Sequence, residues 1–379
     1  MPRTVPHWIW RVALGIAGAV SIVIVVLAWF HANAIRSEFL IPTPHLGAFD
    51  IEVLENQAGR IELSRTEESS KPGFWGLDGG ESYAQVATIA RVTDTVVERA
   101  VRTTDGEFGP GDLARMDPDA YKGDPLSSHR IGFSDIVIPS DIGPHPGWFV
   151  DGRRSTWVLF VHGRGTDRLA ESLRLIPSLV EQGFPVMVMA YRNDEKATSS
   201  DSGMRLWGLE EWRDVEAAVE LGQRKGAQDF VVVGSGFGAS IVSTYLHESD
   251  TIGLIRGAIY DSPVLDLEGV VGDWASDGGT SRLISRFGRW LATIRFGIDW
   301  SALNQLEHVS EFDVPLLLMV GGDDPEVDPT VAEEFATALG DDATFSRFEQ
   351  AGHTDLWNVD QARYEATISN WLFNLLGPE

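Results

Sequence analysis

The chain has 379 residues, of which 43% are hydrophobic, with 39 glycines and 18 prolines, a composition typical of a globular protein with one large core. Its 56 acidic and 30 basic residues give a formal net charge of −26, which would repel nucleic acid and so argues against a nucleic-acid partner. The sequence contains no cysteine, which excludes disulfides, thiolate catalysis and cysteine-ligated zinc.

A transmembrane helix is predicted near the N-terminus. The run Val12–Phe30 contains no charged residue, and its helical length of about 28 Å matches the roughly 30 Å hydrocarbon core of a bilayer. Trp8 and Trp10 precede this run and Trp29 lies near its end, where interfacial aromatic residues are common. We therefore predict a cytoplasmic N-terminus over residues 1–11 and a single-pass anchor over residues 12–30.

The charges beside this run predict its orientation. Arg3, Arg11 and the N-terminal amine precede it, whereas Arg36 beyond it is partly offset by Glu38. The positive-inside rule then places the main domain outside the cytoplasm, at the cell membrane. A cleaved signal peptide is the alternative, because Ala32-Asn33-Ala34 resembles a cleavage site, although the apolar run exceeds the usual length.

Residues 35–128 are predicted to form a β-rich N-terminal extension. Short alternating patterns, such as Phe49, Ile51 and Val53 or Ile61 and Leu63, are separated by Asn, Gly and Pro, which indicates hairpins. The pattern assigns this segment no chemistry.

Residues 129–379 are predicted to form an α/β domain. Apolar strand patterns such as WVLFVHG, PVMVMAY, FVVVGSG and GAIYDSP alternate with amphipathic helices, which is typical of a doubly wound, mostly parallel sheet with helices on both faces. The first helix is expected to carry Leu169, Leu173, Ile176 and Val180 on one face and to end near Gly183. The C-terminal helix repeats this spacing in Tyr364, Ile368, Trp371 and Leu375.

Residues 266–312 are predicted to be a helical insertion in this domain. The spacing of Leu283, Phe287, Trp290 and Ile294 places them on one helix face. Such a stripe most often packs onto the core of its own domain, and a lid over a site is the alternative.

The segment Gly234–Gly238, reading GSGFG, follows a strand and precedes a helix. A strand-turn-helix of this kind is where a nucleophile elbow, G-x-S-x-G, places its serine, but the central residue here is Gly236. Gly236 is therefore a degenerate nucleophile position. Ser235 is a candidate displaced nucleophile, and Ser240, a turn into the helix, is a weaker one.

An acid and a base follow in the chain order that a hydrolase triad requires. Asp324, in VGGDDPEV, comes at the end of a buried strand, with Asp323 as the adjacent alternative. His353, in FEQAGHTDLW, is expected on the loop after the last strand, and Asp355 nearby is expected to be solvated. We predict Asp324 and His353 as an acid and base pair derived from a catalytic triad.

Two backbone N–H groups are candidates for an oxyanion hole. The segment His162–Gly165, reading HGRG, follows a strand and matches an H-G-x-G loop, which would contribute Arg164, and Phe237 after the elbow would supply the second donor.

Residues 129–379 resemble the α/β-hydrolase family, in particular bacterial serine hydrolases related to prolyl-oligopeptidase-type peptidases and esterases. Besides HGRG and the elbow, the resemblance includes AYRNDE at residues 190–195, EWRDVEAAV at 211–219 and DSPVLDL at 261–267. It implies a Ser, Asp and His triad, which corresponds by position to Gly236, Asp324 and His353.

The missing serine leaves three functions open. A pseudoenzyme that binds a small-molecule ester or peptide, or an envelope protein partner, is favoured over an active esterase or peptidase that uses Ser235 with His353 and Asp324, or water activated by His353. A dinucleotide-binding enzyme is the third, because GSGFGA also matches G-x-G-x-x-A and Asp261 ends the next strand. The scattered histidines predict no metal, and we predict no cofactor.

Overall fold

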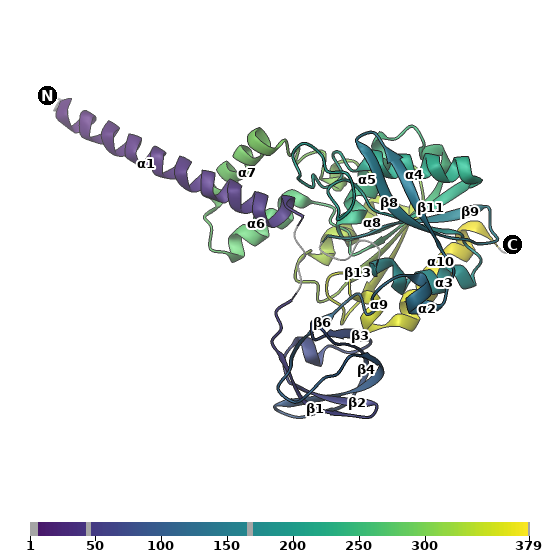
Figure 1. Cartoon of the computed structure of the whole chain (residues 1–379). Helices are drawn as coiled ribbons and strands as arrows, with labels where there is room; N and C mark the ends of the chain where they lie inside the picture. The colour runs from purple at the N-terminus through teal and green to yellow at the C-terminus, as the bar shows by residue number, and fades with distance from the viewer. Residues whose placement is uncertain (1–6, 43–46, 165–169, 378–379) are drawn as a thin grey trace.

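The computed structural model describes residues 7–42, 47–164 and 170–377, which form a long N-terminal helix, a small β-barrel and a larger α/β domain (Figure 1). Helix α1 (His7–Ile35) continues as a π-helical turn, Arg36–Leu40. Its N-terminal part projects away from the rest of the chain, and its C-terminal part packs against the α/β domain (Figure 1). The segment from Trp10 to Leu40 is long and apolar enough to cross a membrane. The helix extends beyond the predicted run at both ends because neither glycine nor proline interrupts residues 31–40 or 7–11.

The predicted β-rich segment is confirmed, and its strands form a closed barrel. Its strands, in the order β1-β2-β5-β4-β3-β6, are β1 (Ile51–Gln57), β2 (Arg60–Ser64), β5 (Val96–Asp105), β4 (Tyr83–Val92), β3 (Trp75–Asp78) and β6 (Leu113–Asp117). The predicted alternation fills the interior with Ile51, Val53, Ile61 and Leu63, each at most 1% exposed. Phe49 lies before β1 and is exposed.

The α/β domain is built on an eight-stranded sheet in the order β14-β13-β12-β11-β9-β10-β8-β7. Strands β7 (Ser134–Ser140) and β8 (Gly143–Val150) are antiparallel to their neighbours. The others are parallel: β9 (Thr156–Val161), β10 (Val186–Met189), β11 (Asp229–Ser235), β12 (Ile255–Asp261), β13 (Leu316–Gly321) and β14 (Ala343–Phe348). The doubly wound, mostly parallel sheet is confirmed.

Helices cover both faces of this sheet, which explains why β9, β10 and β13 are buried along their whole length. One face packs against α4 (Trp212–Lys225), α5 (Phe237–Glu248) and α8 (Pro329–Leu339). The other packs against α3 (Ile176–Glu181) and α10 (Gln361–Leu376), with α2 (Pro125–His129) and α9 (Leu356–Val359) nearby. Tyr364, Ile368 and Trp371 are buried as predicted.

The helix predicted over residues 169–180 is broken in two. A short 3-10 helix, Ala170–Arg174, precedes α3, whose first turn contains Pro177. Proline is favourable in the first turn of a helix and not in its interior, so it marks the restart. Gly183 follows with a φ of +85° and donates to the carbonyl of Val180, consistent with the predicted helix end. Gly165 and Leu169 lie outside the described residues.

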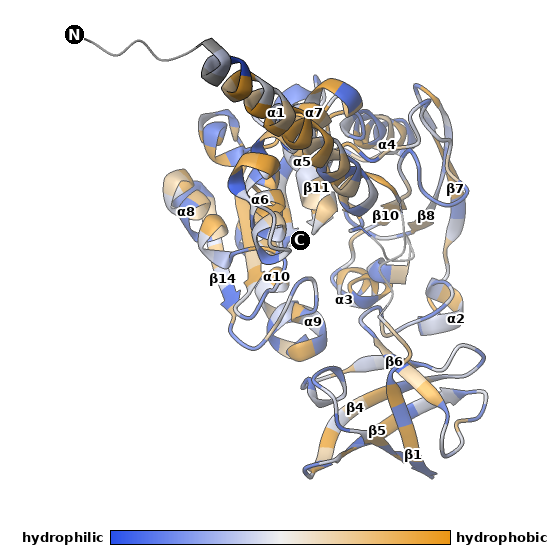
Figure 2. Cartoon of the chain, turned by 90° about the vertical axis from the view of Figure 1, so that its left-hand side faces the viewer, coloured by the Kyte–Doolittle hydropathy of each residue, from blue (hydrophilic) through white to orange (hydrophobic). Residues whose placement is uncertain are grey.

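The insertion contains α6 (Leu267–Asp277) and α7 (Arg282–Phe296), followed by two short 3-10 helices. The expectation that the apolar stripe packs onto the domain core is wrong. Leu283, Phe287, Trp290 and Ile294 are 44% to 62% exposed, while the opposite face of α7 packs against α1. Figures 1 and 2 show α1 and α7 side by side, away from the barrel.

Candidate functional site

The turn between β11 and α5 has the form of a nucleophile elbow without its serine. Gly236 adopts φ +48° and ψ −112°, a strained conformation that glycine tolerates best. Its neighbours are closely packed: a Cβ on Gly234 would lie 2.6 Å from Cα of Ala239, and one on Gly238 would lie 2.2 Å from the carbonyl oxygen of Val161. The two flanking glycines therefore permit the close approach of strand and helix.

The direction of the missing side chain is defined by its surroundings. A Cβ added to Gly236 would lie 3.2 Å from Nε2 of His353 and 3.3 Å from Cγ2 of Thr354. A serine at this position would thus direct its hydroxyl toward the imidazole, given a shift of a few tenths of an ångström by these neighbours.

The structure brings Asp324 and His353 together, as the sequence predicts. Oδ2 of Asp324, after β13, lies 2.9 Å from Nδ1 of His353, on the loop after β14. The other oxygen, Oδ1, accepts hydrogen bonds from the backbone N–H groups of Glu326 and Val327 at 2.8 and 2.9 Å. The Asp324 side chain is 2% exposed, whereas Asp323 is exposed to solvent.

The charge state of His353 depends on this carboxylate. Burial alone would lower the pKa of His353, but its hydrogen bond to Asp324 and the negative charges of Asp324, Glu326 and Asp261 outweigh burial and raise the pKa to about 9. The imidazole is therefore protonated at neutral pH.

Replacing this acid provides a direct measurement. In Asp324→Asn, we expect the pKa of His353 to fall from about 9 to near or below the ordinary value of about 6.5. Because the native pKa is raised, the pair stabilises the fold below about pH 6.5, and this contribution is lost as the pH rises through about 9. NMR titration of the histidine side chains measures the pKa, with His353→Gln assigning the resonance. An unchanged pKa would contradict the assignment of Asp324.

Two strained residues hold the His353 loop. Thr354 and Ser262 have φ values of +54° and +50°, and the Thr354 N–H donates to Oγ of Ser262 at 3.0 Å. The expectation that Asp355 is solvated is wrong. Asp355 is 4% exposed and accepts a hydrogen bond from the Gly352 N–H at 2.6 Å, and burial raises its pKa to about 6. It closes the loop and so positions His353.

The hydroxyls of both candidate serines are hydrogen-bonded to groups other than His353. Ser235 is buried, and its hydroxyl donates to Oε1 of Glu171 at 2.5 Å. Ser240 is also buried and donates to the carbonyl of Val264 at 2.8 Å. The hydroxyl of Ser235 is thus engaged by a carboxylate on another part of the site.

Buried charges behind the elbow were not anticipated from the sequence. Glu171 accepts from the Gly163 N–H at 2.7 Å and from Arg174 at 3.1 Å. Arg174 also donates to the carbonyl of Thr354 at 2.9 Å and to Asn358 at 3.0 Å. Both looked like polar positions on an amphipathic helix, and the sequence offers no motif that marks them.

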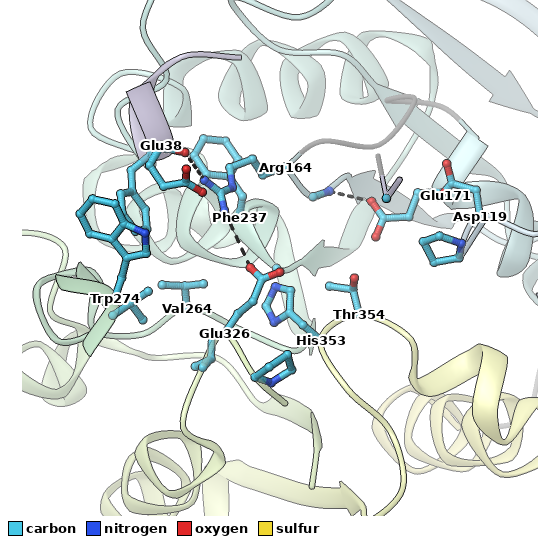
Figure 3. Close-up of a pocket in the computed structure, with 18 of the residues that line it drawn as sticks. Glu38, Asp119, Arg164, Glu171, Phe237, Val264, Trp274, Glu326, His353 and Thr354 are labelled. Atoms are coloured by element: carbon cyan, nitrogen blue, oxygen red, sulfur yellow. Dashed lines mark hydrogen bonds and ion pairs between the residues drawn. The ribbon is translucent and has the colours of Figure 1, made fainter. Parts of the chain in front are cut away.

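The two predicted oxyanion-hole residues lie at the same cavity. Phe237 begins α5 directly after Gly236, and Arg164 follows β9. The Arg164 guanidinium donates to the carbonyl of Glu38 at 2.5 Å and lies 3.8 Å from the Glu326 carboxylate (Figure 3). The side chain thus links the segment after α1 to the loop that carries Asp324.

A cavity of about 490 Å³ opens over these residues. Figure 3 shows His353 and Thr354 between Trp274 on one side and Glu171 and Asp119 on the other, with Phe237 near Arg164 and Glu38. Further lining residues come from the segment after α1, from the barrel and from α6; they include Phe39, Asp78, Arg115, Asp117, Val270, Asp273 and Asp277. Carboxylates outnumber arginines in this lining, which favours neutral or cationic ligands over anionic ones.

The geometry does not support the dinucleotide interpretation. Asp261 is 2% exposed, and its carboxylate accepts hydrogen bonds from Tyr364 and Ser262 at 2.9 and 3.0 Å, so it does not face the turn as a ribose ligand would. Among residues 7–42, 47–164 and 170–377, no three His, Asp or Glu side chains are placed to hold a metal ion.

Comparison with known families identifies the α/β domain. Residues 158–367, more than half of the chain, match the profile described as alpha/beta hydrolase family. The chain therefore belongs to the α/β-hydrolase family. Residues 52–117, the barrel, match a family described as a domain of unknown function (DUF8805). No curated protein sequence matches the chain significantly.

Solved structures agree on the fold. The Pyrococcus furiosus esterase Pf2001 is 19% identical with a TM-score of 0.54, and the match covers 68% of this chain and 98% of the esterase. A Mycobacterium tuberculosis puromycin-hydrolyzing peptidase is also 19% identical with a TM-score of 0.54, over 84% of this chain and 51% of the peptidase. The chain thus spans about half the length of that peptidase, and both likenesses concern the fold alone.

Proposed function

We propose that this protein is a membrane-anchored, ligand-binding member of the α/β-hydrolase family whose catalytic site has lost its nucleophile. Two observations at the elbow carry the proposal. A side chain at position 236 would point toward His353, but the residue there is glycine. The hydroxyl of the neighbouring Ser235 is hydrogen-bonded to Glu171. The intact Asp324–His353 pair and the cavity then serve to bind a ligand.

The proposed ligand is a small ester, amide or peptide-like molecule. The cavity has the size of a small-molecule site. Its lining combines the His353 imidazolium with the N-terminus of α5, and both can attract a carbonyl oxygen of the ligand. Its acidic wall favours a neutral or cationic body. The length and apolar surface of α1 support a single-pass anchor. Arg3 and Arg11, which precede its apolar run, support an N-terminus in the cytoplasm and an α/β domain outside.

Hydrolysis by water activated at His353 is the alternative, because Nε2 faces the space above Gly236. A general base must be unprotonated, and the raised pKa of His353, about 9, keeps it protonated at neutral pH. Such an activity would increase as the pH rises toward 9 and would vanish in His353→Ala, whereas the binding function predicts no His353-dependent turnover at any pH.

The test uses the full chain with a fluorophosphonate probe and short-chain p-nitrophenyl esters, beside Ser235→Ala and His353→Ala. We expect neither labelling nor ester turnover above the level of His353→Ala. Labelling of the native chain that disappears in Ser235→Ala would identify a displaced nucleophile and overturn the proposal. The matched positive control is the Gly236→Ser variant.

A further inference from the structure

Helix α7 presents an apolar face that no described residue covers. Leu283, Phe287, Trp290 and Ile294 are 50%, 44%, 57% and 62% exposed, and their spacing of 4, 3 and 4 residues forms one stripe along the helix. Exposed apolar side chains that are contiguous, and not scattered singly, mark an interaction surface.

The opposite face of α7 docks on α1. Ser285, Gly288 and Ala292 are buried there, and the His31 ring lies so close that a Cβ on Gly288 would be 2.5 Å from its Cδ2. Arg295 donates to Oδ1 of Asn33 at 3.0 Å, and its guanidinium lies 3.6 Å from the centre of the Trp29 ring. These contacts place α7 beside the end of the apolar run of α1, at the depth expected for the membrane surface.

The charges of α7 differ from those of the rest of the chain. The helix contains four arginines and no acidic residue, in a protein with a net charge of −26. Arg282 and Arg286 are exposed and flank the apolar stripe. A helix with Trp, Phe, Leu and Ile on one face and arginines beside it is typical of helices that lie in the interface of a bilayer, where the arginine side chains reach the headgroups.

We propose that α7 lies in the bilayer interface beside α1, with its apolar stripe against the acyl chains of the leaflet next to the α/β domain. The inference rests on the proposed function in one respect, since it takes α1 as spanning the membrane. The packing of α7 against the end of the apolar run of α1, together with the arginines beside the stripe, favours a lipid surface over a second copy or another protein as its occupant. The α6–α7 insertion that lines the cavity then rests on the membrane surface.

The absence of cysteine allows a site-specific test in the full chain. Single cysteines carrying a nitroxide are introduced by Phe287→Cys and Trp290→Cys on the stripe, Val23→Cys on α1, and Phe373→Cys on α10. Phe373 is 57% exposed, as Trp290 is, and its helix α10 lies on the other side of the domain from α1, so Phe373 is the matched control (Figure 1). Each variant is reconstituted in phosphatidylcholine and phosphatidylglycerol nanodiscs, and spin relaxation by oxygen, which enters lipid, is compared with relaxation by a water-soluble nickel chelate.

With oxygen, we expect the spin labels at positions 287, 290 and 23 to relax faster than the label at position 373. With the nickel chelate, we expect their increase in relaxation rate to be at least about threefold smaller than that of the label at 373, because the chelate does not enter the apolar layer. If position 23 contacts lipid while 287 and 290 behave like 373, the inference is overturned and the anchor stands. If position 23 is also in water, the proposed anchor fails, and the inference with it. If neither reagent reaches the label at position 290 and the labels of two copies lie close together, the stripe is a dimer contact, and this result would also overturn the inference.

Discussion

At about pH 9 and above, where His353 loses its proton, the Gly236→Ser variant should gain fluorophosphonate labelling at its new serine, at a rate at least about a thousandfold above that of the native chain. A triad serine can contribute roughly a millionfold to catalysis, and its other partners remain here. The Asp324–His353 pair is formed, and the new Cβ points at Nε2 of His353. The gain in labelling rate should stay below this millionfold because His353 and Thr354 must move slightly to admit the serine side chain.

This gain should depend on the imidazole. The double variant Gly236→Ser, His353→Ala should label no faster than the native chain, and mass spectrometry should locate the adduct on residue 236. Gly236→Ala is the matched control, since it adds the same Cβ in the same strained backbone conformation without a hydroxyl. If a stable Gly236→Ser protein gains no labelling, the elbow is not a hydrolase site that lacks only its serine.

The Arg174→Met variant should lose about 3–5 kcal/mol of the free energy of unfolding, because removing one member of a buried ion pair leaves the other charge without compensation. Arg174 is 6% exposed and donates to the carboxylate of Glu171, which is 1% exposed. It also donates to the carbonyl of Thr354 and to Asn358, so the loop that carries His353 and the helix α9 that follows it each lose one hydrogen bond.

Denaturant unfolding of the full chain in detergent measures this loss. Arg224→Met is the control, because the Arg224 side chain is 53% exposed and its pair with Glu220 spans 3.3 Å at the surface, where such pairs contribute about 0–1 kcal/mol. A Glu171→Gln, Arg174→Met double variant should recover part of the lost stability, since it removes the uncompensated charge. Equal effects of Arg174→Met and Arg224→Met would contradict the structural role of the buried pair.

Much of the α/β domain follows from local patterns. Strands buried on both faces read as continuous apolar runs, such as residues 156–161 and 316–321, and their alternation with helices predicts the doubly wound sheet. The same order places residues at the carboxyl ends of parallel strands on one edge. This explains why Asp324 and His353, 29 positions apart, could be predicted to meet.

Other features depend on contacts between distant segments. The closure of the barrel requires β1 to pair with β6, and nothing local in either strand specifies that pairing. The stripe on α7 has the same period whether it faces a protein core or another apolar environment, so periodicity alone could not show that Trp290 is exposed. Glu171 was missed because a charged residue in a helical pattern normally faces water.

The segment that follows α1 makes the N-terminal helix more than a tether. Glu38 and Phe39 line the cavity. Two hydrogen bonds hold this segment on the α/β domain: the Trp207 indole donates to the carbonyl of Phe39 at 3.0 Å, and the Arg205 N–H donates to the carbonyl of Leu40 at 2.8 Å. This wall of the cavity and the N-terminal helix are therefore one structural unit. A truncated, water-soluble preparation that begins after Leu40 would have a cavity with one wall missing, and its ligand preference would differ from that of the intact protein.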